Sequence, residues 1–139
     1  MSTTNVLLVD DEERFLKTTK MLLDKAECNV ITAPDGGQGL DQLKAQSIDV
    51  VVLDVKMPGV DGVEVLRRIK ELAPLVEVIM LTGHSTLDTA ILGLKLGAFD
   101  YLTKPCDINE LKLKIKAAHE RRSVMLAKIQ KAKKQVYGL

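Results

Sequence analysis

Acidic side chains follow two apolar segments of the sequence. Asp10 and Asp11 open an acidic run at residues 10–13, and Asp54 directly follows a second apolar run. Acids after a strand suit a helix N-terminus, where they cap backbone N–H groups and oppose the helix dipole. Two carboxylates about 4 Å apart would repel by roughly 4 kcal/mol at an effective dielectric near 20, so a cluster needs a cation or a proton. Carboxylate oxygens are ligands that Mg²⁺ prefers. The acids alone leave helix capping and metal binding open.

A lysine and a threonine follow two further apolar runs. Lys104 comes after the last run and Thr82 after the run before it. A surface ion pair with Asp10 or Asp54 would explain the lysine without any function. An ammonium beside a metal can also hold a phosphoryl oxygen, to which a hydroxyl can donate a further hydrogen bond. Carboxylate, metal, ammonium and hydroxyl are the groups that phosphoryl transfer requires, because catalysis there is mainly positioning and charge stabilisation.

Five short apolar runs must position these side chains. They are apolar on both faces, as buried parallel strands are, and cover residues 6–9, 30–33, 50–53, 78–81 and 99–102. Segments with helical periodicity lie between them, and Gly and Pro mark the changes. The pattern is β-α repeated five times, which places helices on both faces of a parallel sheet. Ligands bind such sheets outside the carboxyl ends of the strands, where the acids, the threonine and the lysine fall.

Composition restricts the class of protein. The chain has 139 residues, of which 46% are apolar and 28% charged, so it suits one globular domain and is not disordered by composition. No apolar run approaches the roughly 18 residues of a membrane span, and the N-terminus lacks the cationic start of a signal peptide. Two cysteines are too few for a disulfide scaffold and fit a reducing cytosol. We therefore expect a cytoplasmic protein without a membrane span.

Four segments together resemble the receiver domain of two-component response regulators. They are Val-Leu-Leu-Val-Asp-Asp-Glu at 6–12, Val-Leu-Asp-Val-Lys-Met-Pro-Gly-Val-Asp-Gly at 52–62, Leu-Thr-Gly at 81–83 and Phe-Asp-Tyr-Leu-Thr-Lys-Pro at 99–105. Each motif alone is weak, but their order and spacing together are specific. The resemblance implies a flavodoxin-like, doubly wound (βα)5 fold. Its five-stranded parallel sheet would have the order 2-1-3-4-5, within a receiver domain at residues 1–121.

The resemblance also implies the chemistry of the site. Asp54 matches the residue that accepts a phosphoryl group from a histidine kinase or a phosphotransfer protein. Asp10, Asp11, Asp54 and the backbone carbonyl of Lys56 match the Mg²⁺ site. Mg²⁺ is therefore the expected cofactor, and the protein is expected to act in a bacterial-type two-component phosphorelay.

Further positions match residues that respond to the phosphate. Thr82 and Lys104 match the pair that grips the phosphoryl group. Tyr101 matches the switch aromatic, which turns inward when Thr82 moves toward the phosphate. The change would alter the surface of helix 4, strand 5 and helix 5 and so control a partner or an output domain. Lys56 and His84 match positions that flank the attacking water and are expected to tune the lifetime of the phosphate.

A haloacid-dehalogenase-like, Mg²⁺-dependent phosphatase is the nearest enzymatic alternative, because it also uses an Asp nucleophile, Mg²⁺, a Thr and a Lys. Such an enzyme needs a second acid two residues after its nucleophile. If Asp54 were the nucleophile, that position would be Lys56, which is not an acid. If Asp10 were the nucleophile, the position would be Glu12, but no Thr follows it. We therefore expect no enzyme activity beyond self-phosphorylation from a phosphodonor and slow autodephosphorylation.

The charge of the chain is distributed unevenly. Residues 1–111 carry 11 Lys/Arg and 18 Asp/Glu, a formal charge of −7, whereas residues 112–139 carry nine Lys/Arg and one acid, a charge of +8.

A helix is expected to begin after Asp107. Its apolar positions alternate in steps of three and four over residues 108–136, with Arg122 as the exception, and His119 is expected to be solvated.

The end of this helix has no receiver sheet left to cover. We treat residues 122–139 as a helical C-terminal extension that serves as a linker or a coiled coil. The apolar pattern predicts a weak parallel homodimer through residues 108–136, favoured by higher salt. A solvated extension and a helix that binds another protein are the alternatives. Direct nucleic-acid binding is not expected, because no recognition motif accompanies the lysines.

Overall fold

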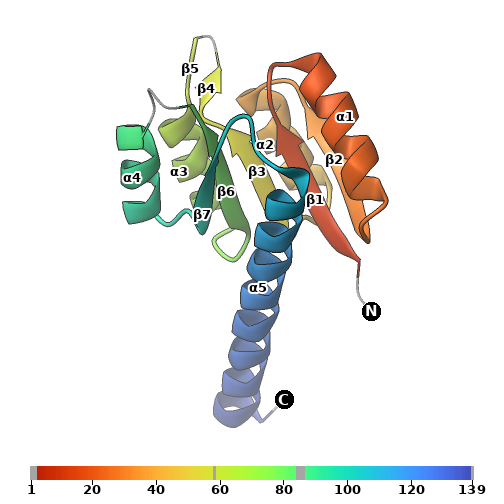
Figure 1. Cartoon of the computed structure of the whole chain (residues 1–139). Helices are drawn as coiled ribbons and strands as arrows, with labels where there is room; N and C mark the ends of the chain where they lie inside the picture. Colours follow the sequence, from red (N-terminus) through yellow and green to blue (C-terminus); the bar gives the residue numbers. More distant parts are fainter. Residues whose placement is uncertain (1–2, 58, 84–86, 139) are drawn as a thin grey trace.

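Strands and helices alternate along the described residues, apart from two short strands that follow the third strand directly (Figure 1). The computed structural model describes residues 3–57, 59–83 and 87–138. All five predicted strand–helix pairs are present. The elements in order are β1 (Thr4–Val9), α1 (Glu13–Asp24), β2 (Cys28–Ala33), α2 (Gly36–Ala45), β3 (Val50–Asp54), β4 (Lys56–Met57), β5 (Val60–Asp61), α3 (Gly62–Leu72), β6 (Glu77–Thr82), α4 (Leu87–Lys95), β7 (Asp100–Thr103) and α5 (Ile108–Tyr137).

The main sheet has five parallel strands in the order β2-β1-β3-β6-β7. Because β6 and β7 are its fourth and fifth strands along the chain, this is the predicted order 2-1-3-4-5. The register aligns the carboxyl ends of neighbouring strands: Asp54 lies opposite Leu81, and Thr82 lies opposite Thr103. Residues that follow different strands therefore meet at one edge of the sheet, which we call the carboxyl edge.

Helices cover both faces of the sheet. On β1, Leu7 and Val9 point into the core that α2, α3 and α4 complete, whereas Val6 and Leu8 point into the core beneath α1 and α5. All four side chains are fully or almost fully buried. This two-sided burial explains why the strands are apolar on both faces rather than alternating.

A short hairpin follows β3 and was not predicted. β4 pairs with β5 in antiparallel fashion, Lys56 opposite Asp61, and Gly59 has a φ of 69° in the turn between them. Asp61 then caps α3 by accepting a hydrogen bond from the backbone N–H of Val63 at 3.0 Å. A Cβ at Gly62 would lie 2.6 Å from the Cα of Val55, so only glycine lets the helix start this close to the end of β3.

α5 is a single 30-residue helix, about 45 Å long. Asp107 caps it, as expected, by accepting from the backbone N–H of Asn109. Its buried residues, Leu111, Ile115 and Ala118, all lie in the first half. The helix then continues without a break past residue 121 and extends beyond the sheet (Figure 1). Among the described residues, no helix is long and apolar enough to cross a membrane.

Where α5 passes the start of the strands, it makes a polar cluster that we call the amino edge. Arg122 Nε lies 3.2 Å from Asp49 Oδ1, just before β3, and Asp49 Oδ2 accepts from the backbone N–H of Asn5. His119 Nδ1 lies 2.6 Å from Thr4 Oγ1 and 4.0 Å from Asp49 Oδ2. The expectation that His119 is solvated is therefore wrong, because the helix places this ring against the first strand.

Candidate functional site

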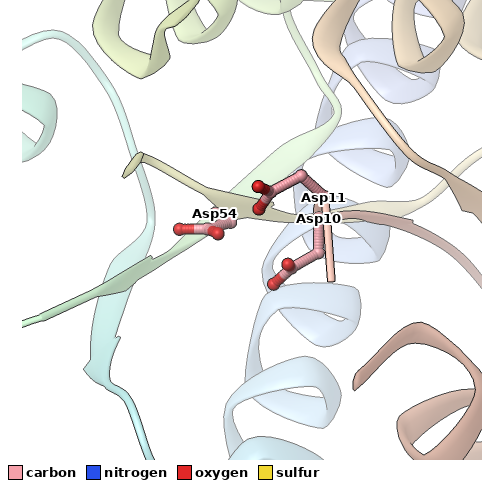
Figure 2. A group of neighbouring side chains, drawn as sticks. All are labelled: Asp10, Asp11 and Asp54. Atoms are coloured by element: carbon pink, nitrogen blue, oxygen red, sulfur yellow. The ribbon is translucent and has the colours of Figure 1, made fainter. Parts of the chain in front are cut away.

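Three carboxylates converge at the carboxyl edge (Figure 2). One oxygen from each of Asp10, Asp11 and Asp54 lies within 4.8 Å of the others. Asp10 is completely buried and Asp54 is 5% exposed, whereas Asp11 faces solvent. The structure thus brings together the three acids that the sequence placed after β1 and β3.

Backbone hydrogen bonds hold the two buried carboxylates. The peptide N–H of Asp10 donates to Ala33 O, which extends the pairing of β1 with β2. Asp10 Oδ1 accepts from the backbone N–H of Glu12 at 2.9 Å, and Asp54 Oδ1 accepts from the backbone N–H of Lys56 at 3.0 Å. Each side chain is therefore fixed by the chain that immediately follows its strand.

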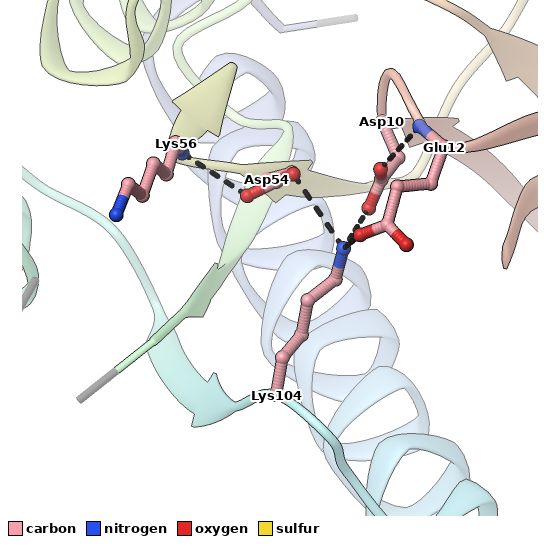
Figure 3. Close-up of polar contacts among 5 residues, drawn as sticks. All are labelled: Asp10, Glu12, Asp54, Lys56 and Lys104. Atoms are coloured by element: carbon pink, nitrogen blue, oxygen red, sulfur yellow. Dashed lines mark hydrogen bonds and ion pairs between the residues drawn. The ribbon is translucent and has the colours of Figure 1, made fainter. Parts of the chain in front are cut away.

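Lys104 bridges the carboxylates from the end of β7 (Figure 3). Its Nζ lies 2.5 Å from Asp10 Oδ2, 3.1 Å from Glu12 Oε1 and 3.5 Å from Asp54 Oδ2, and 4.3 Å from the centre of the Phe15 ring. Sequence reasoning assigned no role to Glu12 or Phe15. The only signals were that Glu12 belongs to the acidic run and that Phe15 follows it closely, because both contacts depend on how α1 starts.

The environment acts on Asp54 and Lys104 in different ways. Burial, followed by the charge of Asp10, raises the pKa of Asp54, although the Lys56 N–H and Lys104 oppose the change. Burial alone would lower the pKa of Lys104, but its hydrogen bonds to Asp10 and Glu12 and the charge of Asp54 outweigh burial and raise it. Lys104 therefore stays cationic at neutral pH.

The donor set fits a magnesium ion. Asp10, Asp11 and Asp54 offer only carboxylate oxygens, which are hard ligands, and Lys104 supplies one positive charge among them. Exposed Asp11 gives access from solvent. This arrangement can hold a hard divalent cation with open positions for water or a phosphate oxygen.

Thr82 and Tyr101 lie on the neighbouring strands β6 and β7. Thr82 is buried, and its hydroxyl donates to Leu102 O at 3.4 Å. The backbone N–H of Lys104 in turn donates to Thr82 O, so the two residues are joined through their main chains. Tyr101 is half-buried, lies opposite Met80, and packs against the core beneath α4.

The two positions expected to tune the phosphate lifetime lie in different situations. Lys56 is exposed, and its side chain extends away from Lys104 (Figure 3). His84 lies outside the described residues, so its predicted role stays a prediction.

The sequence matches the response regulator receiver domain family over residues 6–116. The chain belongs to this family. The fold and the carboxyl-edge cluster of this receiver domain agree with that assignment, and the phosphatase alternative gains no support from it.

Curated relatives of the receiver are longer regulators. The alkaline phosphatase synthesis transcriptional regulatory protein PhoP of Bacillus subtilis is 35% identical over 119 residues, which are 86% of this chain and 50% of PhoP. The DNA-binding transcriptional regulator NtrC of Klebsiella pneumoniae is 40% identical over 103 residues, 74% of this chain and 22% of NtrC. The chain thus spans half or less of the length of these relatives.

Solved structures give the same fold. A response regulator receiver domain protein from Clostridium thermocellum is 41% identical, with a TM-score of 0.84 over 88% of this chain and 98% of that one. NtrX from Brucella abortus is 28% identical, with a TM-score of 0.85 over 90% of this chain and 29% of NtrX. The shared fold therefore covers nearly all of the first solved chain and less than a third of the second.

Proposed function

We propose that this receiver accepts a phosphoryl group on Asp54 from a histidine kinase or a phosphotransfer protein. The observation that carries the proposal is the convergence of Asp10, Asp11 and Asp54 within 4.8 Å, with Lys104 within 3.5 Å of Asp54. An Asp54 oxygen attacks the phosphorus of the phosphohistidine, the P–N bond breaks, and the imidazole nitrogen leaves with the bonding electrons and takes up a proton from solvent.

The residues around Asp54 lower the cost of this transfer by positioning and charge. The Lys56 N–H orients the Asp54 carboxylate, and Lys104 faces the position where phosphoryl oxygens arrive. Asp10, Asp11, Asp54 and the backbone carbonyl of Lys56 would hold Mg²⁺, which when bound neutralises phosphoryl charge. Phosphoryl transfer ends with one modified carboxylate per chain, so the protein is a signalling component rather than a turnover enzyme.

Phosphorylation switches a surface through Thr82 and Tyr101. About two negative charges arrive at Asp54, and the Thr82 hydroxyl leaves Leu102 O to donate to them. Tyr101 then fills the space beside β6. Two observations support this role for the surface of α4, β7 and α5. Leu87 and Ile91 of α4 are exposed, so a partner could cover them. Lys114 of α5 pairs with Asp100 of β7 at 2.6 Å, so these two elements are linked.

The switched surface controls a partner or an output domain in the cytoplasm. Phosphate loss then resets it, and Lys56 and His84 tune the rate by flanking the incoming water. Similarity to PhoP and NtrC, whose names describe transcriptional regulators, supports an output in transcription.

The experiment is phosphorylation with acetyl phosphate and Mg²⁺, followed by mass spectrometry of the intact protein. We expect a gain of one phosphoryl group, and none after Asp54→Asn or after chelation of Mg²⁺. Asp49→Asn, which removes a carboxylate at the opposite edge of the sheet, is the control and should be modified like the wild type. Full incorporation in Asp54→Asn would refute the assignment.

A further inference from the structure

The end of α5 exposes a line of apolar side chains. We call residues 121–137 the tail helix. Met125, Ile129, Ala132 and Val136, the tail seam, recur at steps of four, three and four and continue the line of Leu111, Ile115 and Ala118 that packs on the sheet. Met125 is 41% exposed and Val136 is 72% exposed. This spacing is the seam that a second helix covers in a coiled coil.

The receiver itself anchors the start of the tail helix. Arg122, the exception in the apolar pattern, has its Nε 3.2 Å from Asp49 Oδ1. Arg121 Nε lies 3.5 Å from Glu77 Oε2, and its guanidinium lies over the Phe99 ring. Both arginines are thus neutralised by their own chain. The seam open to a partner begins at Met125 and leaves the sheet in a direction that these ion pairs fix.

The charges beside the seam select the kind of partner. With Ile129 at a heptad a position, Lys128 and Lys133 lie at the flanking g and e positions, and Lys131 and Lys134 lie on the outer face. Residues 121–139 contain six Lys/Arg and no acid. In a parallel pair of copies, Lys128 of one chain would meet Lys133 of the other. The charged residues at the flanks of a second copy are therefore all positive, and Leu126 and Gln135, which also lie there, are neutral.

We propose that the tail seam is a docking site for an acidic amphipathic helix of another protein. Apolar residues of that helix would cover Met125, Ile129 and Val136, and its carboxylates would pair with Lys128 and Lys133. The charge complementarity favours this occupant over a second copy, which is the partner in the predicted homodimer through residues 108–136. Nucleic acid or an anionic membrane would be attracted by all the tail lysines to a similar extent. A helix on the tail seam would instead pair with Lys128 and Lys133 beside the seam and leave Lys131 and Lys134 on the outer face in solvent.

The experiment uses the full chain and two synthetic peptides of heptad design. Both carry Ile and Leu at a and d positions; one has Glu at all e and g positions and the other has Lys. We expect the acidic peptide to bind about tenfold tighter than the basic one in fluorescence anisotropy, with affinity falling as salt rises.

Two double variants with the same charge change locate the contact. Lys128→Glu/Lys133→Glu changes the flanks of the seam and should weaken binding of the acidic peptide about tenfold. Lys131→Glu/Lys134→Glu changes the outer face and should keep most of the affinity. Equal losses in both variants would overturn the proposal, because binding would then follow total charge.

Binding of the alternative partners, which are a second copy, an anionic membrane and nucleic acid, is measured directly. Sedimentation of the full chain tests the second copy, and titrations with phosphatidylserine vesicles and with duplex DNA test the remaining two. A self-association tighter than the peptide complex, or tighter binding to vesicles or DNA, would overturn the proposal. The tail seam lies away from Asp54, so unphosphorylated protein and Asp54→Asn should give the same peptide affinity. Failure here would leave the phosphoryl-transfer proposal untouched.

Discussion

The two edges of the sheet contain the same kinds of charged group, but the balance of positive and negative charge differs between them. At the carboxyl edge, one ammonium, Lys104, faces Asp10, Glu12 and Asp54, so negative charge is in excess. At the amino edge, Asp49 meets Arg122, and the backbone N–H of Asn5 donates to it, so charge is balanced. An excess of buried negative charge attracts a cation, which can in turn neutralise the charge of a phosphoryl group, whereas a balanced pair positions a helix.

The largest expected difference between the edges is in chemistry. Lys104→Met removes the ammonium that faces the incoming phosphoryl oxygens and should slow phosphorylation of Asp54 by acetyl phosphate about 100-fold. Arg122→Met makes the same kind of change at the amino edge and should leave the rate within about twofold of the wild type. Rates are followed by mass spectrometry of the intact protein over time. Equal slowing in both variants would mean that Lys104 acts only through folding stability.

Stability should respond in opposite directions at the two edges. Without Mg²⁺, Asp54→Asn removes a buried charge beside Asp10 and should raise the free energy of unfolding by about 1 kcal/mol. Asp49→Asn removes the partner of Arg122 and should lower it by about 1 kcal/mol. Urea denaturation at neutral pH measures both. A loss of stability in Asp54→Asn would contradict the idea that the carboxyl edge is strained by its own charge.

The pH dependence follows from the raised pKa of Asp54. The folded protein holds a proton on this carboxyl more tightly than the unfolded chain does. Its contribution to stability is therefore greatest below the ordinary Asp pKa of 3.8 and falls as pH rises through the folded pKa. In Asp54→Asn, the free energy of unfolding should lack this part of its decrease with rising pH, whereas Asp49→Asn should keep it. Urea denaturation at several pH values without Mg²⁺ measures the difference.

How much the sequence predicted also differs between the edges. Asp10, Asp54 and Thr82 directly follow apolar runs, and Lys104 is the second residue after one. A parallel sheet with β-α connections brings such positions together, so the spacing predicted the cluster. Asp49 and Arg122 are 73 positions apart, and their contact depends on where α5 crosses the sheet. Local periodicity carries no signal for that crossing. The pattern therefore marked Arg122 only as a break in the apolar line.

Short elements were missed for a related reason. β4 and β5 have two residues each, which is too short for an alternating pattern to be detected. His119 was misjudged because its neighbours in sequence are basic, whereas its partner Thr4 comes from the first strand. Elements of two residues, and contacts that depend on where a helix crosses the sheet, are what the sequence left undetermined.

Mg²⁺ should distinguish the edges by a smaller amount. A ligand that binds only the folded state stabilises it by about 1.4 kcal/mol at a concentration ten times its dissociation constant. We expect this gain in the wild type and in Asp49→Asn, and little of it in Asp11→Asn, which lacks the exposed carboxylate of the cluster. Thermal unfolding at matched ionic strength, with Ca²⁺-free buffers, provides the measurement. Equal gains in all three proteins would place the cation outside the carboxyl edge.

The smallest expected effect isolates the ion pair at the amino edge. The Asp49 and Arg122 side chains are 22% and 19% exposed, so water screens their attraction only in part. A double-mutant cycle with Asp49→Asn and Arg122→Met should give a coupling free energy of about 0.5–1 kcal/mol, because the second substitution costs less once the first has removed the pair. Asp54→Asn with Arg122→Met joins the two edges and should be additive within about 0.5 kcal/mol. A coupling as large in that pair would show that charge at the two edges is linked through α5, and the two clusters would then be one electrostatic unit rather than a chemical site and a separate helix anchor.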